Sequence, residues 1–236
     1  MKISIKNFLL ALFLSLGSFT QAQSLDEIVA KHIEAIGGKE NWAKLKALRT
    51  ECTMKAQGTD INFTIVQVDK KCMRQDIALA GMVGYSIINN KEGWNYAPWQ
   101  GHTKAEAMTA DDVKNSQDEL WLQDEFIIYK ELGKTMEYLG KDDVDGTECF
   151  KIKMSSKDGK ETTFYIDLST YLVIKQTEKM DSNGQVIENA TFFSDYKKLD
   201  EGIVYPMSIS GEWGEMTITK LEINPKVDES IFSLPK

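Results

Sequence analysis

The second half of the chain consists of short apolar-rich segments separated by turn-forming residues, at a spacing of roughly ten residues. Asp145-Gly146, Asp158-Gly159 and Asn183-Gly184 are hairpin dipeptides, because these residue types tolerate a positive φ. The segments predict strands at residues 150–154, 163–166, 171–179, 188–196, 203–210 and 215–223. Short strands at this spacing predict an antiparallel meander, which restricts the chain to sheet-based folds.

Strands are also predicted nearer the N-terminus. From Leu48 to Gln57, apolar and polar side chains alternate, which is typical of a strand with one face in water. Ile61, Phe63 and Ile65 share one face of the next predicted strand, and further strands follow at residues 71–79 and 85–90. With the later segments this gives about ten or eleven strands, and an open sheet of that size must curl or close.

Two regions break the strand pattern. Residues 24–47 are predicted to form two short helices, because Ser24 or Asp26 can cap the first and Gly37-Gly38 can end it. Residues 109–130 are predicted to form a helical insertion, either as two helices or as one that bends. These helices would cover one face of the sheet or plug its mouth.

The first 22 residues have the features of a secretory signal peptide. Lys2 and Lys6 precede a nine-residue apolar run, Phe8–Leu16, which is too short to span a bilayer. Small residues precede Ala22, after which we expect cleavage; an uncleaved anchor is the alternative. No later segment is apolar for long enough to cross a membrane. The remaining 214 residues suit one all-β domain as well as two small ones.

The charge and the cysteines limit the possible partners. The formal charge is −8, and loss of the two signal lysines makes it −10, which argues against nucleic acid. If Cys52 and Cys72 lie on strands with another strand between them, they are about 10 Å apart, which is too far for a disulfide. We therefore expect Cys52, Cys72 and Cys149 to be free and mostly buried.

Several motifs occur in a fixed order along the chain. Residues 36–51 are followed by a basic strand at 70–77 and by NNKEGWNYAP at 89–98, a polar turn that leads into Trp94, Tyr96 and Pro98. A hairpin with a polar turn follows at 162–176. The tail, 221–236, carries a spaced pattern of Asn224, Val227, Asp228, Phe232 and Pro235. Taken together, these motifs resemble the LolA-like family, which includes the periplasmic lipoprotein-localisation carrier.

The resemblance implies a mainly β fold in which residues 23–236 form a single domain. This fold is a strongly curved antiparallel sheet, or incomplete barrel, with helices as a lid over an apolar cavity. The implied function is to hold lipid, lipoprotein acyl chains or another hydrophobic ligand in the periplasm, with transient membrane association and without a cofactor. Arg74 is the candidate for a lid–barrel contact, because an arginine on the matching strand has that role in the carrier.

Apolar side chains on the inward faces are the candidate ligand contacts. Strand parity and the resemblance together give Met54, Phe63, Ile65, Trp94, Tyr96, Trp121, Phe126, Ile127, Phe164, Ile166 and Met207. The same side chains would equally form a packed core, and the sequence does not separate these two interpretations. Ten methionines favour an adaptable apolar surface.

Patterns for catalysis and for metal binding are missing from the sequence. The two histidines, His32 and His102, show no metal-ligand spacing, and no Gly-x-Ser-x-Gly elbow occurs. The acidic stretch at residues 141–148 does not fit the register of a calcium loop. We therefore expect no enzyme activity and no metal. The alternatives are an envelope sensor or interaction module that uses the same groove to dock a protein partner, and an enzyme of unrecognised type.

Overall fold

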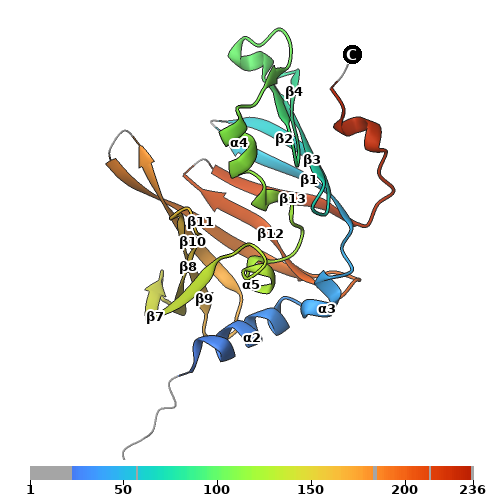
Figure 1. Cartoon of the computed structure of the whole chain (residues 1–236). Helices are drawn as coiled ribbons and strands as arrows, with labels where there is room; N and C mark the ends of the chain where they lie inside the picture. The colour runs from blue at the N-terminus through green and yellow to red at the C-terminus, as the bar shows by residue number, and fades with distance from the viewer. Residues whose placement is uncertain (1–22, 57, 183–184, 213, 235–236) are drawn as a thin grey trace, which may run out of the picture.

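The computed structural model describes residues 23–56, 58–182, 185–212 and 214–234 (Figure 1). The expected signal peptide, residues 1–22, and the expected turn at Asn183-Gly184 both lie outside the described residues. Within these ranges, no helix combines the length and the apolar character needed to cross a membrane.

One antiparallel sheet of thirteen strands dominates the described residues, in the order β6-β5-β4-β3-β2-β1-β13-β12-β11-β10-β9-β8-β7. The first six strands are β1 (Ala47–Ala56), β2 (Thr59–Val68), β3 (Cys72–Leu79), β4 (Met82–Asn89), β5 (Gly93–Tyr96) and β6 (Glu106–Ala107). The others are β7 (Thr135–Val144), β8 (Thr147–Ser155), β9 (Glu161–Asp167), β10 (Val173–Ser182), β11 (Gln185–Lys198), β12 (Val204–Gly211) and β13 (Gly214–Ile223).

The expected fold class, a curved antiparallel sheet with helices against it, is confirmed (Figure 1). The sheet does not close, because β6 and β7 are its two edges. It has more strands than the ten or eleven expected, in part because β5 has four residues and β6 only two. Strands this short carry too few side chains to produce an alternating pattern.

Neighbouring strands within the described sheet are consecutive in the sequence, except for β1 and β13. These two strands pair from Leu48 opposite Ile223 to Lys55 opposite Glu215. Asn224 secures this join. Its Oδ1 accepts hydrogen bonds from the backbone nitrogens of Lys46, at 2.7 Å, and Ala47, at 3.2 Å.

The N-terminal helices are those expected, α2 (Leu25–Ala35) and α3 (Lys39–Trp42). The Ser24 hydroxyl caps α2 by accepting a hydrogen bond from the backbone nitrogen of Glu27, at 3.2 Å. Gly37 and Gly38 then reverse the chain with φ angles of +104° and +85°, in the region that favours glycine. The two helices therefore meet at a tight elbow formed by this glycine pair.

The helical insertion consists of three short pieces, α4 (Ala110–Asn115), η2 (Asp118–Leu120) and α5 (Glu125–Ile128). Thr109 caps α4 in a capping box with Asp112, and Asp124 caps α5. Trp121 between η2 and α5 has extended backbone angles, φ −87° and ψ 129°. Each new cap restarts the helix, so the insertion is segmented. The other 3₁₀ helices are η1 (Pro98–Gln100) and η3 (Glu229–Phe232).

The insertion also links the two edges of the sheet, since it leaves β6 at Ala107 and enters β7 at Thr135. We call residues 108–134 the strap. The strap crosses one face of the sheet, which we call the concave face. Gln67 of β2 donates a hydrogen bond to the Glu119 carbonyl at 2.6 Å, and the Lys70 nitrogen donates one to the Leu120 carbonyl at 2.7 Å.

The main core lies between the concave face and the helices. Ile28 of α2 and Phe126 of α5 pack against Ile152 of β8 and Ile166 of β9, and all four are at most 1 % exposed. At the other end of α2, Ile36 and Trp42 pack with Ile127 and other buried residues of the strap. Side chains of both helical regions therefore pack on the concave face.

The three cysteines are free, as expected. Cys52 lies on β1 and Cys72 on β3, with β2 between them. Cys52 and Cys149 are buried, whereas Cys72 is half-buried. Burial raises the pKa of the Cys52 thiol to about 11, which keeps it protonated and unreactive at neutral pH.

Candidate ligand-binding cavity

A cavity of about 280 Å³ lies between the helices and strands β9 to β12. Thirteen of its eighteen lining residues are aliphatic or aromatic. Those from the helical regions are Ile36, Trp42, Trp121, Leu122 and Phe126, and those from the sheet are Phe164, Val173, Phe193, Tyr196, Val204, Tyr205, Pro206 and Ile209. A concave, mainly apolar space with a few polar groups is typical of a small-molecule site.

A row of apolar side chains continues from this cavity across the concave face. Residues directly opposite each other in paired strands lie on the same face. Starting from β11, the register aligns Phe193, Ile209, Met216, Met54, Ile61, Leu79 and Met82 on seven neighbouring strands. None of these seven is fully buried, and Met82 is 38 % exposed. We call this set the apolar row; it shares Phe193 and Ile209 with the cavity.

The polar group buried most deeply at the cavity is His32 of α2, which is 1 % exposed. Its Nδ1 lies 2.7 Å from the Tyr171 carbonyl oxygen, so this nitrogen carries a proton and donates it. Its Nε2 lies 3.6 Å from Oδ1 of Asp124, which is longer than a hydrogen bond. The side chains of α2 and the strap thus face each other here as a charged pair.

The Asp124 carboxylate decides the protonation of His32. Burial lowers the pKa of His32, but attraction to the Asp124 carboxylate 3.6 Å away, with the hydrogen bond to the Tyr171 carbonyl, outweighs burial. The pKa of His32 is therefore raised above its ordinary value. The cationic form places a donor on Nε2, directed toward the acceptor on Asp124.

This arrangement predicts a reversal of pH dependence in Asp124→Asn. In the wild type the raised pKa makes the His32 contribution to stability complete below pH 6.5 and lost as the pH rises through the folded-state pKa. Without the carboxylate, burial dominates and depresses the pKa, so the variant gains stability over the same rise in pH. Urea unfolding of both proteins from pH 5 to 8 measures this. Parallel pH profiles would contradict it.

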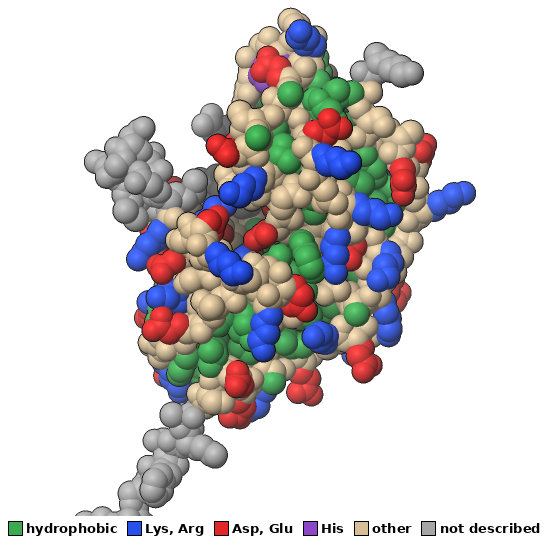
Figure 2. Space-filling model, viewed as in Figure 1, with side chains coloured by type: hydrophobic (Ala, Val, Ile, Leu, Met, Phe, Trp, Pro, Cys, Tyr) green, Lys and Arg blue, Asp and Glu red, His purple; other side chains and the backbone are tan. Residues whose placement is uncertain are grey.

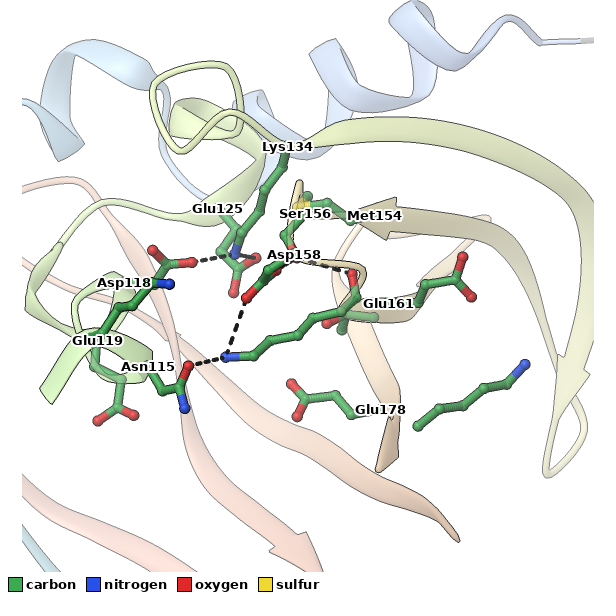
Figure 3. Close-up of a pocket in the computed structure, with 14 residues that line it drawn as sticks. Asn115, Asp118, Glu119, Glu125, Lys134, Met154, Ser156, Asp158, Glu161 and Glu178 are labelled. Carbon is green, nitrogen blue, oxygen red and sulfur yellow. Dashed lines mark hydrogen bonds and ion pairs between the residues drawn. The ribbon is translucent and has the colours of Figure 1, made fainter. Parts of the chain in front are cut away.

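A second, charged pocket of about 570 Å³ lies beside the cavity (Figure 3). Lys134 reaches between Asp118, at 2.9 Å, and Glu125, at 3.1 Å. Burial raises the pKa of Glu125, and Lys134 offsets part of that rise. Glu125 lines both spaces, so it separates the apolar cavity from the charged pocket. Across the described residues, no cluster of histidine, cysteine or carboxylate side chains is arranged to hold a metal ion.

The structure brings some of the candidate residues together. Trp121, Phe126 and Phe164 line the cavity, and Met54 belongs to the apolar row. Phe63, Ile65 and Met207 pack with Tyr205 and Ile209 of the cavity wall. Ile127 and Ile166 lie in the packed core, at 6 % and 0 % exposed.

Trp94 and Tyr96 lie on the opposite face of the sheet. The register aligns Val66, Arg74, Ile87 and Trp94 across β2 to β5. Val66 is adjacent to Ile65 in the chain, so this row points away from the concave face. Trp94 packs with Phe232 of the C-terminal segment, and Tyr96 packs on Tyr85 with ring centroids 5.5 Å apart. These two aromatic residues therefore lie outside the cavity.

Arg74 shares that outer face and does not meet the strap. Its Nη1 donates a hydrogen bond to the Ile231 carbonyl at 2.8 Å, and its Nη2 pairs with Asp76 at 2.7 Å. The Arg74 guanidinium also lies over the Tyr85 ring. The expected lid contact of Arg74 is replaced by a contact that holds the C-terminal segment on the sheet.

Most of the residues that line the cavity were not among the candidates, including His32, Asp124, Phe193 and Tyr196. The sequence shows His32 on the apolar side of a helix, which fits ordinary packing equally well. Asp195, between Phe193 and Tyr196, has a left-handed φ of 52° that interrupts regular alternation. Strand parity therefore could not place both of these aromatic residues at one cavity.

Comparison with known proteins identifies the fold. Neither a scan of protein-family models nor a search of curated proteins found a match. Among solved structures, a DUF1329 family protein from Desulfovibrio piger aligns with a TM-score of 0.57 at 13 % identity, covering 88 % of this chain and 96 % of its own. A LolA superfamily protein from Nitrosomonas europaea aligns with a TM-score of 0.56 at 9 % identity, covering 87 % of this chain and 96 % of its own. The fold is LolA-like.

A third solved structure with this LolA-like fold is a putative outer membrane lipoprotein-sorting protein domain from Vibrio parahaemolyticus. Its TM-score is 0.52 at 14 % identity, covering 87 % of this chain and 94 % of the other. These identities establish a shared LolA-like fold and leave the site residues of this chain to be judged on their own geometry.

Proposed function

We propose that this protein is a periplasmic binding or carrier protein for hydrophobic ligands. The ligand would lie in the cavity between the helices and the concave face, within one domain of residues 23–236. The observation that carries this proposal is the continuity of the apolar cavity with the apolar row. A half-exposed row of this length is a surface that a soluble monomer ordinarily keeps for binding.

The cavity volume points to the size of the ligand. Small-molecule pockets span about 300–1,000 Å³, so about 280 Å³ suits one apolar chain or part of one. Burial of each methylene contributes ~0.8 kcal/mol. Ten methylenes give about 8 kcal/mol before the cost of immobilisation, which supports useful affinity without many polar contacts.

Larger ligands would require movement of the strap. It is held at the sheet by hydrogen bonds to Gln67, Asp69 and Lys70, and at α2 by the His32–Asp124 pair. Because the strap joins both edges of the sheet, it cannot swing away from one hinge. We propose that it opens when the two edges move apart, which enlarges the cavity beneath the strap.

The likeness to a described lipoprotein-sorting domain supports lipid or lipoprotein acyl chains as the cargo. The surface charge supports release of the protein into an aqueous compartment, because lysines and acidic residues are interspersed over the visible face (Figure 2). We propose binding without catalysis. Glu125, whose pKa burial raises, is held in an ion pair by Lys134.

Native mass spectrometry of the protein purified gently from the periplasm, followed by lipid extraction, tests the proposal. We expect a bound lipid or lipopeptide, or uptake of an added one, because a ligand would remove the apolar row from contact with water. A clean apo mass with no uptake of added lipopeptide would show that the concave face is only a packed core.

A further inference from the structure

We infer that the cavity also recognises the polar head of its ligand, and that this head is a neutral hydroxyl group. This inference rests on the proposed function and names the class of ligand: a single-chain alcohol, such as a long-chain alcohol or a monoacylglycerol. The groups that select it are His32 and Asp124, which face each other at the cavity wall.

An unsatisfied nitrogen marks the position. Across the part of the chain that the structure describes, His32 Nε2 is the buried side-chain nitrogen or oxygen without a hydrogen-bond partner. Buried polar groups are nearly always paired, so an orphaned one at a cavity requires an explanation. The His32 ring is held rigidly, by its bond to Tyr171 and by the Phe126 ring, whose centroid is 4.7 Å away. Nε2 is therefore a pre-oriented group that faces Asp124 at ion-pair distance and lacks a hydrogen-bond partner.

The facing pair determines the chemistry of the missing partner. Nε2–H of His32 is a donor, and Asp124 Oδ1, 3.6 Å away, is an acceptor. Oδ1 already accepts from the Phe126 backbone nitrogen at 2.9 Å and retains a lone pair. An oxygen that accepts from His32 and donates to Asp124 completes both bonds, and a hydroxyl is the simplest group that does so.

Charge excludes the two commonest ionic heads. A fatty-acid carboxylate would gain a bond from His32 but would meet the negative charge of Asp124, with Glu125 also on the cavity wall. An alkylammonium would gain an ion pair with Asp124 but would be repelled by the positive charge of His32. The pair itself sums to zero charge, so a neutral head meets no net charge there and costs less to desolvate than an ionic head.

The apolar tail has its place beside the head. Phe126 contacts both the His32 ring and, at 4.9 Å between centroids, the Phe164 ring of the opposite wall. Val173, Phe193 and Ile209 continue that wall toward the apolar row. A chain anchored by its hydroxyl at His32 would therefore lie against aromatic and aliphatic side chains along its length.

Binding of dodecanol, dodecanoate and dodecylamine to the full mature chain tests the inference. Trp42 and Trp121 line the cavity, so their fluorescence reports occupancy. We expect dodecanol to bind about tenfold or more tightly than either ion. With ¹⁵N-labelled histidine, dodecanol is expected to shift the His32 Nε2 resonance and leave His102, the other histidine, unchanged.

Asp124→Asn provides the matched variant, because asparagine can still cap α5 while the repulsive charge is removed. The affinity for dodecanol should fall by about tenfold, because the variant loses the carboxylate acceptor and the neutral His32 no longer donates from Nε2, whereas Asp111→Asn on exposed α4 should keep the wild-type affinity. If Asp124→Asn fails to fold, the selectivity and the histidine spectra of the wild type still test the hydroxyl inference.

The possible outcomes separate the two proposals. Equal binding of all three probes with an unmoved His32 resonance would overturn the hydroxyl inference and leave a non-selective apolar site. If dodecanoate shifts the His32 Nε2 resonance and dodecanol does not, the inference would also be overturned, in favour of an anionic head. If none of the three probes binds, the result would count against the proposed function itself.

Discussion

Gly37→Ala is expected to lower the free energy of unfolding by more than about 3 kcal/mol, the largest effect we predict for a single methyl group. Gly37 has a φ of +104°, which costs any L-residue about 1–2 kcal/mol. Its added Cβ would also overlap the Gly202 carbonyl oxygen and lie 2.7 Å from the Ile203 Cα. Both are backbone atoms of the β11–β12 connection, so neither can rotate away.

The neighbouring glycine is the matched control. Gly38 has a φ of +85°, but its added Cβ would meet no atom within 4 Å. Gly38→Ala should therefore cost only the strain of its backbone conformation, φ +85° and ψ 148°, which is about 1–3 kcal/mol and less than the loss in Gly37→Ala. Urea unfolding followed by circular dichroism compares the two. Equal losses would show that the elbow between α2 and α3 is not packed against the β11–β12 connection.

Ile209→Asp is expected to weaken ligand binding by more than about a hundredfold. Ile209 lines the cavity and belongs to the apolar row, so its side chain stands where both surfaces meet. A carboxylate there would have to lose its hydration against an apolar chain, without a cation to pair with. Titration with dodecanol, followed by tryptophan fluorescence, measures the loss.

Ser210→Asp is the control for this charge. Ser210 is adjacent to Ile209 on β12, and alternation directs its side chain to the other face of the sheet. The affinity of Ser210→Asp for dodecanol should remain within about twofold of the wild type, because the added charge stays away from the cavity. A thermal melt of both variants separates loss of binding from loss of fold. Undiminished binding by a folded Ile209→Asp would show that the ligand does not occupy the cavity.

Local signals in the sequence were sufficient for most of the elements. Asp145-Gly146 forms its turn with both φ angles positive, and Ser24 caps α2 as its position suggested. Alternation correctly grouped Met54, Phe63 and Ile65 on one face of the sheet. Each of these features depends on neighbours within a few residues, which is why a single sequence contains them.

The placement of whole faces was not contained in those signals. Alternation places Trp94 and Tyr96 together but does not say which face of the sheet they occupy. Both faces of this part of the sheet carry apolar side chains, because Phe63 and Ile65 pack on one face and Phe232 of the C-terminal segment packs on the other. The same limit applies to the His32–Asp124 pair, which depends on α2 and the strap meeting across about 90 residues of chain.

The pairing of β1 with β13 has a consequence for how the molecule assembles. Strands β2 to β6 and β7 to β12 are built from hairpins between sequence neighbours, which close quickly. The β1–β13 ladder instead joins residues 47–56 to residues 214–223, so its loop-closure entropy is large. Two local meanders therefore form early, and the late zipping of β1 to β13 merges them into one curved sheet. A chain that emerges N-terminus first cannot complete this sheet until its last strand has been released.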